Sequence, residues 1–471
     1  MHIAPAGDRA LLVTLPDASA AHLRALAQRV RAMSGVVAAI VGHESIYIIG
    51  TSDADAVRRA VEAPVASKEG PAKRHDIEVS FHESNALDLN DFLKHVRLSR
   101  EDFLRQLASV HLTVRYLGFR AGFAYLDGWP AHWQMPRRST SRNLVPGGSF
   151  ATAGSMAGFY PVDSPGGWNI LGRTAAPLWD PQREPPNLFA PGDEISIVVN
   201  LNVEPPLRRF EPAENRLQVQ GAVAEVVSPG QLTTIVGAPD WGRLEHGQAP
   251  GGPFDEEAAA IANAAVGNPP HAPLLECVLV GPKLRMRKNL RAAFCDADLN
   301  VREDLDIGRI RGMRGYLAIE GGIDEMRLRY ADGPTVLKKG DSLWGAAPWR
   351  RFQSGVSKAA ASRRTLKTIR ILRGPHDAPP LPEEWEVTPQ MNRVGVRLKP
   401  VTPIDVKLPA DLPSCGAQFG TLQWHADGSL LALGPDHPVT GGYLQPATVP
   451  SSERWKLGQL APGERVRLIA V

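Results

Sequence analysis

Hydrophobic and polar residues alternate with two different periods in the first 70 residues of the chain. In Ala20–Met33, apolar residues recur every three or four positions, which predicts an amphipathic helix. Short apolar runs at Ala10–Leu15, Val36–Val41 and Ser45–Ile49 have the composition of strands, and a second helical pattern follows them. This alternation of strands and helices predicts a small α+β domain over residues 1–70.

A second pattern, of short strand-like runs separated by glycine turns, dominates the rest of the chain. Two helices, predicted at Leu87–Val96 and Ser99–Leu107, precede most of these runs. A third helix, predicted at Asp255–Val266 with Asp255 as its N-cap, interrupts them. The prediction is therefore a mainly β protein with one small α+β domain and three β-rich units, which cover residues 74–205, 216–350 and 366–471.

A glycine pair followed by a later glycine turn occurs once in each β-rich unit. The turn comes 19 to 26 residues after the first glycine of the pair and leads into another strand-like run. Glycine supplies the positive φ that such tight turns need. Three matches in the same order predict related β modules rather than one large domain. The pairs are Gly166-Gly167, Gly321-Gly322 and Gly441-Gly442, and the later turns contain Gly192, Gly340 and Gly463.

Composition and charge exclude several classes of protein. The 471 residues carry a formal net charge of +3, with basic and acidic residues interspersed, so no nucleic-acid footprint is expected. The three cysteines lack CxxC spacing, which argues against a disulfide framework or a structural zinc site. No apolar run approaches the length of a membrane span, and no secretory signal pattern opens the sequence. We therefore expect a cytoplasmic protein with no membrane partner.

Standard catalytic and nucleotide-binding motifs are absent from the sequence. It contains no GxxxxGK[ST] phosphate loop, no GxGxxG, no HExxH and no GxSxG. His111, His246, His425 and His437 also lack metal-ligand spacing, so no metal site is predicted. If the protein uses ATP, the sequence does not mark where the nucleotide binds.

The segment Gly118–Leu126 places Arg120 between aromatic residues in a glycine-flanked turn. A guanidinium in such a turn can bind a carboxylate or a phosphate through two parallel hydrogen bonds. This makes Arg120 a candidate for substrate binding. The alternative is an arginine on a β-turn that faces solvent.

The most glycine-dense part of the chain runs from Val145 to Thr174. Small residues such as Gly166 and Gly167 let backbone amides approach a ligand closely. Polar and aromatic residues that could contribute further contacts lie beside them. The alternative is a tightly turned barrel without a ligand. The candidates for substrate contact in this segment are Ser164, Gly166, Gly167, Trp168 and Arg173.

A third cluster combines Asp240 and Arg243, which lie three residues apart in Asp240-Trp241-Gly242-Arg243. Asp240 is a candidate for acid–base chemistry, and Arg243 for positioning Asp240 or the substrate. The alternative is a structural ion pair between the two. Asn263, on the helix predicted after Asp255, is a candidate ligand contact, with a polar group on the helix surface as the alternative.

Several of these segments resemble the B-type and C-type subunits of bacterial ATP-dependent 5-oxoprolinase, a family also called allophanate hydrolase subunits 1 and 2. The start of the chain, Ala4–Val13, and the Gly118–Leu126 segment resemble the B-type protein, with Ala121 in place of the family's proline. The later part resembles the C-type protein. The matching segments are Pro136–Arg138, Val145–Gly148 and Ser164–Thr174 for the B type, and Val226–Thr234, Asp240–Arg243, Ala262–Asn268, Gly315–Ile323, Asn392–Leu398 and Thr440–Val449 for the C type.

The resemblance implies a natural fusion of the B-type and C-type proteins, built from cyclophilin-like β-barrel modules in tandem. It implies a component of an ATP-dependent amide or lactam hydrolase that opens 5-oxoproline to glutamate together with a separate A-type subunit. ATP would then bind with that partner. We expect Asp240, Arg243 and Arg173 to be catalytic. Substrate contacts are expected from Arg120, Ser164, Gly166, Gly167, Trp168 and Asn263.

Two alternatives follow from the same resemblance. The family is related to the carboxyltransferase domain of urea carboxylase, so the first is a biotin-dependent carboxyltransferase acting on urea or an amide. This chain has no Met-Lys-Met signature of a biotin carrier, so the carrier would be a separate domain. The second alternative is a non-catalytic regulatory protein, in line with the family's kinase-inhibitor name. A homo-oligomer is compatible with all three.

Overall fold

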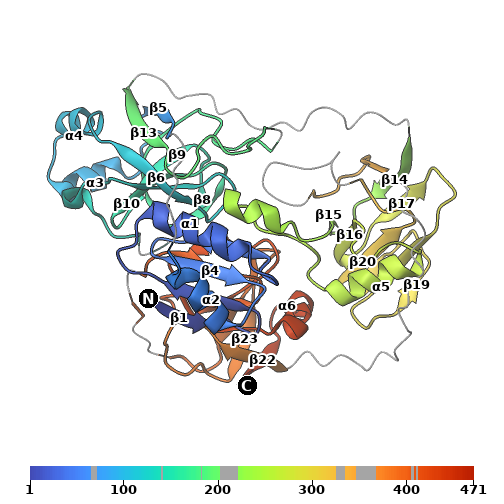
Figure 1. Cartoon of the computed structure of the whole chain (residues 1–471). Helices are drawn as coiled ribbons and strands as arrows, with labels where there is room; N and C mark the ends of the chain where they lie inside the picture. Colours follow the sequence, from blue (N-terminus) through green and yellow to red (C-terminus); the bar gives the residue numbers. More distant parts are fainter. Residues whose placement is uncertain are drawn as a thin grey trace.

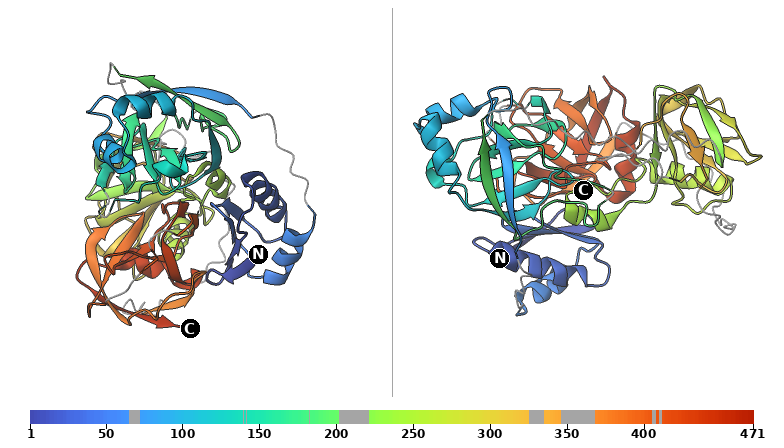
Figure 2. Two further views of the ribbon diagram at one scale, coloured as in Figure 1. Left: turned by 90° about the vertical axis from the view of Figure 1, so that its left-hand side faces the viewer. Right: turned by 90° about the horizontal axis from the view of Figure 1, so that it is seen from above.

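The computed structural model arranges the chain as four units, with two closed β-barrels beside each other (Figures 1 and 2). The N-terminal unit packs against the second barrel, and a unit of two sheets lies at the other end of the molecule (Figure 1). The structure describes residues 1–64, 72–138, 140, 142–181, 183–201, 221–324, 335–345, 368–404, 408–409 and 412–471.

The N-terminal unit is a four-stranded antiparallel sheet with two helices on one face. Side chains alternate across a strand, so Leu11 and Val13 face the helices while Leu12 and Tyr47 face the opposite way. That second face packs on Cys415 of the second barrel. The sheet order is β1-β2-β4-β3, with β1 His2–Pro5, β2 Ala10–Thr14, β3 Ala38–Val41 and β4 Ser45–Ile49, and the helices are α1 Ala20–Arg31 and α2 Ala54–Glu62.

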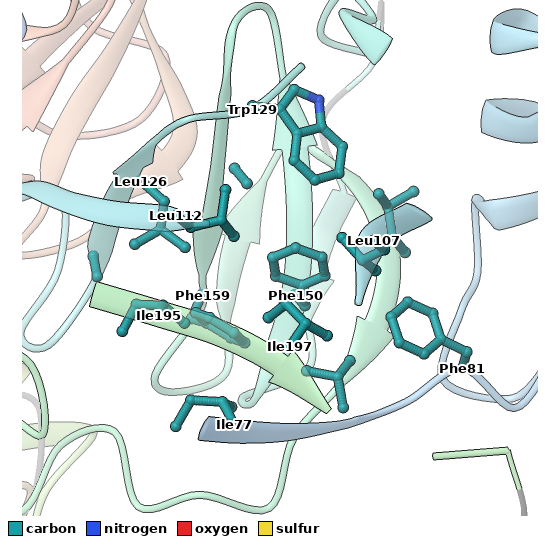
Figure 3. Close-up of a cluster of buried hydrophobic side chains, with 14 of the residues drawn as sticks. Ile77, Phe81, Leu107, Leu112, Leu126, Trp129, Phe150, Phe159, Ile195 and Ile197 are labelled. Atoms are coloured by element: carbon teal, nitrogen blue, oxygen red, sulfur yellow. The ribbon is translucent and has the colours of Figure 1, made fainter. Parts of the chain in front are cut away.

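The first barrel closes in the strand order β10-β7-β6-β13-β5-β12-β9, and its first and last strands, β5 and β13, pair in parallel. Its core includes Phe81, Phe150, Phe159 and Ile197 (Figure 3). The elements are β5 Arg74–Ser80, α3 Leu89–Val96, α4 Arg100–Leu107, β6 Leu112–Leu117, β7 Ala124–Asp127, η1 Ala131–Trp133, β8 Arg142–Val145, β9 Ser149–Ala153, β10 Met156–Phe159, β11 Ser164–Gly166, β12 Asn169–Arg173 and β13 Glu194–Asn200.

The second barrel repeats this topology strand for strand. Its order is β22-β29-β26-β27-β24-β23-β30, and again the first and last strands, β22 and β30, are parallel. A two-stranded arm stands beside each barrel, β8 with β11 in the first and β25 with β28 in the second. The elements are β22 Thr368–Arg373, β23 Glu384–Met391, β24 Gly395–Pro400, β25 Cys415–Gly416, β26 Thr421–Trp424, β27 Leu430–Leu433, β28 Thr440–Gly441, β29 Leu444–Thr448, η5 Ser451–Glu453, α6 Arg454–Gln459 and β30 Arg465–Ala470.

The middle unit differs from the two barrels. Its described residues form a three-stranded sheet, β17-β14-β21, and a five-stranded sheet, β15-β16-β20-β18-β19. The first and last strands, β14 and β21, pair antiparallel rather than parallel. The elements are β14 Ala222–Ser228, β15 Leu232–Val236, η3 Trp241–His246, α5 Glu256–Ala265, β16 Leu274–Val280, β17 Lys283–Met286, β18 Ala292–Cys295, β19 Val301–Arg302, β20 Arg309–Ile319 and β21 Ser342–Trp344.

The glycine-pair repeat therefore occupies equivalent positions in the two barrels and a different kind of position in the middle unit. Gly166 ends β11 and Gly441 ends β28, at equivalent places in the two arms, and Gly192 and Gly463 lie in the turns before β13 and β30. Gly321 follows β20 in a sheet without a barrel counterpart. The prediction of barrel modules in a mainly β chain is confirmed for two units, while the three-fold relation does not extend to the described part of the middle one.

Several predicted boundaries lie outside the described residues. The transitions expected near residue 70, between 205 and 216, and between 350 and 366 lie in or next to such segments, so the exact limits of the units stay predictions. No helix among the described residues is long and apolar enough to cross a membrane. Cys277, Cys295 and Cys415 are buried as free thiols.

Candidate functional site

A cleft of about 130 Å³ lies where the first barrel, the middle unit and the second barrel meet. The first barrel lines it with residues 119–121, and the second barrel with residues 393–394 and 436–438. The middle unit contributes several residues between 235 and 252. Segments far apart in the sequence thus form one hollow, and junctions between domains are common places for ligand sites.

Contacts from both neighbouring units hold the turn that carries Arg120. The turn joins β6 to β7, and its Phe119 has a φ of 58°, a left-handed conformation uncommon outside glycine. The amide of Phe119 donates to Oγ1 of Thr440 in the second barrel at 2.8 Å. The amide of Gly122 donates to the carbonyl of His246 in the middle unit at 3.0 Å. The backbone around Arg120 is therefore fixed on both sides, and Arg120 lines the cleft.

Asp240 and Arg243 form an ion pair in the wall of the cleft. Asp240 immediately precedes η3, and Arg243 lies three residues on, where side chains of a 3-10 helix come into register. Nε of Arg243 lies 2.8 Å from Oδ2 of Asp240, and Nη1 donates to Oε1 of Gln248 at 3.2 Å. Side-chain exposures of 42% for Asp240 and 28% for Arg243 leave both within reach of a ligand.

Arg393 borders the cleft but is committed to a buried network. Its Nη1 donates to Oε1 of Glu276 at 2.8 Å, and its Nη2 donates to the carbonyl of Gly252 at 2.7 Å. Its Nε and Nη2 also donate to both carboxylate oxygens of Asp436. Burial opposes ionisation of Glu276, but Arg393 and Arg314 outweigh it and hold the Glu276 pKa below its ordinary value. The network fixes one wall of the cleft rather than offering a free cation.

His437 adds a neutral imidazole to the cleft. Its Nδ1 lies 2.9 Å from the carbonyl oxygen of Pro438, which can only accept, so Nδ1 carries the proton. Burial lowers the His437 pKa to about 4, so the ring is uncharged at neutral pH. Nε2 therefore holds a lone pair and can accept a hydrogen bond.

The glycine-dense segment forms a separate group of candidates. Ser164 and Gly166 lie in β11, Gly167 and Trp168 follow it, and none of these four lines the cleft. The Trp168 ring packs edge-on against Phe123, with 5.5 Å between ring centroids. The structure therefore unites Arg120 with Asp240 and Arg243, and places these four candidates in or next to the arm of the first barrel.

Arg173 and Asn263 make contacts within their own units. Nε of Arg173 donates to the carbonyl of Gly147 at 2.9 Å. Nδ2 of Asn263 donates to the carbonyls of Pro270 and Ala272, and its Oδ1 accepts from Asn268. Neither residue lines the cleft. The roles in catalysis and substrate binding expected for them stay predictions.

Three ionisable residues of the cleft were not candidates in the sequence: Arg393, Asp436 and His437. Arg393 lies in the Asn392–Leu398 segment that carries part of the family resemblance, so a signal was present. For His437 and Asp436 no signal existed, because their partners are set by loops of the folded barrel. Among the described residues, no group of three or more His, Cys, Asp or Glu could hold a metal ion.

Family models of the carboxyltransferase domain match this chain twice. The model of subdomains C and D matches residues 1–189, and the model of subdomains A and B matches residues 246–470. The chain belongs to the carboxyltransferase-domain family. In this family's terms, the Arg120 turn lies in the C-and-D part, while Arg393 and His437 lie in the A-and-B part.

Individual relatives fit this assignment. The B-type subunit of 5-oxoprolinase from Escherichia coli O157:H7 is 34% identical over 202 residues, which are 41% of this chain and 93% of that protein. The C-type subunit of 5-oxoprolinase from Escherichia coli K12 is 26% identical over 284 residues, which are 52% of this chain and 90% of that protein. This carboxyltransferase-domain chain thus joins B-like and C-like regions in one polypeptide.

A solved structure has the same overall arrangement. The crystal structure of TTHA0988 superposes with a TM-score of 0.78 and 27% sequence identity. The match covers 98% of this chain and 99% of that one. The arrangement of barrels and middle unit is therefore shared across the full length of another member of the fold.

Proposed function

We propose that this chain is the fused B–C component of an ATP-dependent hydrolase that opens the lactam ring of 5-oxoproline to give glutamate. A separate A-type subunit would complete the enzyme. The similarity to the B-type and C-type subunits of 5-oxoprolinase supports this substrate.

One observation carries the proposal: the cleft is assembled from the B-like and the C-like regions together. Arg120 comes from the first region and His437 from the second, while Asp240 lies between the two matched ranges. Neither region alone provides all three side chains. If the reaction needs both the B-type and the C-type subunit in related enzymes, it would need both the B-like and the C-like region of this chain.

The side chains of the cleft have the chemistry that a small anionic lactam requires. We propose that Arg120 binds the substrate carboxylate, because a guanidinium pairs with a carboxylate through two hydrogen bonds. Nε2 of His437 would accept a hydrogen bond from the lactam N–H, a role that suits a neutral ring with a low pKa. Asp240, oriented by Arg243 at 2.8 Å, would accept the proton of the attacking water and return it to the ring nitrogen as the C–N bond breaks.

The size of the cleft favours a small ring over a nucleotide. Its volume of about 130 Å³ is below the range of about 300–1,000 Å³ that is usual for drug-sized ligands. The sequence contains no phosphate-binding loop, and we assign ATP to the A-type partner. What this chain contributes is substrate orientation and proton transfer.

A biotin-dependent carboxyltransferase acting on urea or an amide is the second candidate. The carboxyltransferase name of the matching family models favours it. Like the first, it would use the cleft for a small amide. It differs in requiring a biotin carrier and bicarbonate instead of direct hydrolysis. A non-catalytic regulatory role is the third candidate, and it predicts partner binding without turnover.

The test is glutamate release from 5-oxoproline by this chain mixed with its A-type partner, with and without ATP. We expect ATP-dependent turnover that falls at least tenfold in Asp240→Asn and in Arg120→Gln. Arg105→Gln, on the exposed surface of α4, is the matched control and should be unaffected. Turnover that requires bicarbonate and a biotinylated protein would favour the carboxyltransferase. Association without any turnover would favour the regulatory role.

A further inference from the structure

The arms of the two barrels meet around Arg137. Arg137 lies in the segment between η1 and β8, and the amide of the next residue, Arg138, donates to the carbonyl of Gly167 at 2.9 Å. On the other side, a Cβ atom added to Gly442 would lie only 3.0 Å from Nη2 of Arg137. The first of the two equivalent glycine pairs thus bonds the backbone next to Arg137, and the second borders the Arg137 guanidinium.

Arg137 differs from its neighbours in having no carboxylate partner among the described residues. Arg138 and Arg142 both pair with Asp88, at 2.8 and 2.7 Å. The guanidinium carbon of Arg137 instead lies 5.8 Å from the ring centroid of Tyr443, within the range of a cation–π contact. The half-buried Arg137 guanidinium is therefore held above an aromatic ring, and no carboxylate among the described residues pairs with it.

Two buried polar atoms next to Tyr443 also lack hydrogen-bond partners among the described residues. They are Nε2 of Gln423, a residue that is only 1% exposed, and Nε2 of His425. A Cβ atom on Gly441 would lie 3.4 Å from Nε2 of Gln423 and 3.3 Å from Cδ2 of Tyr443, so both border the same glycine. An unsatisfied buried donor costs about 1–3 kcal/mol, which is a reason to expect a ligand that satisfies it.

The equivalent face of the first barrel is packed with apolar side chains. There β9 presents Ala151 and Ala153, and Trp168 of the arm joins them in one hydrophobic cluster. In the second barrel the equivalent strand, β26, and the residue after it provide Gln423 and His425. The same topological position thus carries apolar side chains in the first barrel and polar side chains in the second.

We propose that the junction of the two arms is a second binding site, separate from the cleft, for a small carboxylate. Arg137 would bind the carboxylate, the Gln423 amide would donate to a second acceptor on the ligand, and the Tyr443 ring would cover its flat face. The His425 ring packs against the Tyr443 ring at a tilt of 31°, with 4.6 Å between centroids. Burial, followed by the nearby Arg397, lowers the His425 pKa to about 4, so Arg137 is the cation of the site at neutral pH.

The site is tested by calorimetric titration of the full chain with 5-oxo-L-proline, L-glutamate and 2-pyrrolidinone, a lactam that lacks the carboxylate. Titrations are repeated in an Arg120→Gln background, which removes the proposed carboxylate contact of the cleft. We expect at least one carboxylate probe to bind in that background and to lose at least tenfold in affinity in Arg137→Gln. Pyrrolidinone should show no such dependence. Equal carboxylate affinities with and without the Arg137 side chain would overturn the proposal.

A second variant separates binding from folding. Gln423→Leu removes the unpartnered donor while keeping a similar volume, so the melting temperature should stay the same or rise while carboxylate affinity falls. A fall in both would indicate a structural role and reject the site. The proposed site would also be rejected if Arg137→Gln bound carboxylates normally and lost only its association with the A-type partner. Because binding is read directly, failure of glutamate release bears on the proposed function and not on this site.

Discussion

Arg393 and Glu276 form a buried ion pair of 2.8 Å between the second barrel and the middle unit. The two residues lie 117 positions apart, and each side chain is almost fully buried. Arg314 reaches the same oxygen of Glu276 at 3.2 Å, and Tyr316 donates to the other oxygen at 3.0 Å. The pair therefore joins two units at the wall of the cleft, and its loss should affect stability and site geometry together.

Glu276→Gln should destabilise the chain by about 3 kcal/mol or more, because it removes the buried counter-charge of Arg314 and leaves Arg393 with Asp436 alone. The measurement is hydrogen exchange of the amides in β16 and β20, since a chain of four units need not unfold in one step. Asp306→Asn is the matched control: its pair with Lys283 is 53–59% exposed and should contribute less than about 1 kcal/mol. Equal effects of the two substitutions would contradict the assigned role of Glu276.

Glu276 also predicts a loss of stability in acid. Its folded pKa is below the unfolded value, so its contribution is present above the unfolded pKa and is lost as pH falls through the folded one. The loss should therefore begin only below about pH 4.3. The measurement is the hydrogen-exchange rate of β16 amides between pH 6 and pH 3, corrected for the pH dependence of intrinsic exchange. Protection that fades well above pH 5 would point to other groups.

His437 and His425 predict an earlier acid effect in the second barrel. Both pKa values are lowered to about 4 in the folded chain from 6.5. Their stabilising contribution is present above about pH 6.5 and is lost as pH falls toward 4, by up to about 1.4 kcal/mol per pH unit for each residue. Melting temperatures between pH 7 and pH 5 should fall, and less steeply in His437→Gln. An unchanged slope in that variant would contradict the assignment.

The helices and the relation between the two barrels could be predicted from the sequence because their signals are local. The helix expected over Ala20–Met33 is α1, Ala20–Arg31, and the one expected after Asp255 is α5, with Asp255 capping Ala258 at 3.2 Å. The glycine pairs marked equivalent places in two barrels. Around Gly321 the described residues form open sheets instead of a barrel, since a glycine turn fixes only its own backbone and not how distant strands pair.

The candidate site could be predicted in part, for a similar reason. Asp240 and Arg243 are three residues apart, so one turn of helix suffices to pair them. Arg120 was visible as an arginine in a glycine turn, but its place beside Asp240 depends on the docking of two units. His437 carried no signal, because the bond that fixes its tautomer and the burial that lowers its pKa exist only in the folded loop.

Arg173 was expected to be catalytic, and Arg173→Ala tests that prediction. The hydrogen bond of its Nε joins β12 to Gly147 beside β9, so removing it should loosen the first barrel by about 1 kcal/mol or more. If Arg173 also acts in catalysis, kcat should fall at least a hundredfold while the far-ultraviolet spectrum stays unchanged. Arg29→Ala is the control, because it removes hydrogen bonds from α1 to carbonyls near the end of α2. If Arg173→Ala lowers activity no more than this control does, the role of Arg173 is structural.

Gly247→Ala tests whether turnover depends on the junction between the first barrel and the middle unit. Gly247 has a φ of +77°, and an added Cβ would lie 2.5 Å from the carbonyl oxygen of Arg120. The substitution should therefore push the Arg120 turn away from Asp240 and lower kcat/KM at least tenfold. Gly340→Ala is the matched control, because its φ of +88° brings similar backbone strain of about 1–2 kcal/mol while nothing lies within 4 Å of its Cβ. If both variants lose activity equally, strain alone explains the effect, and the relative position of Arg120 and Asp240 does not limit the reaction.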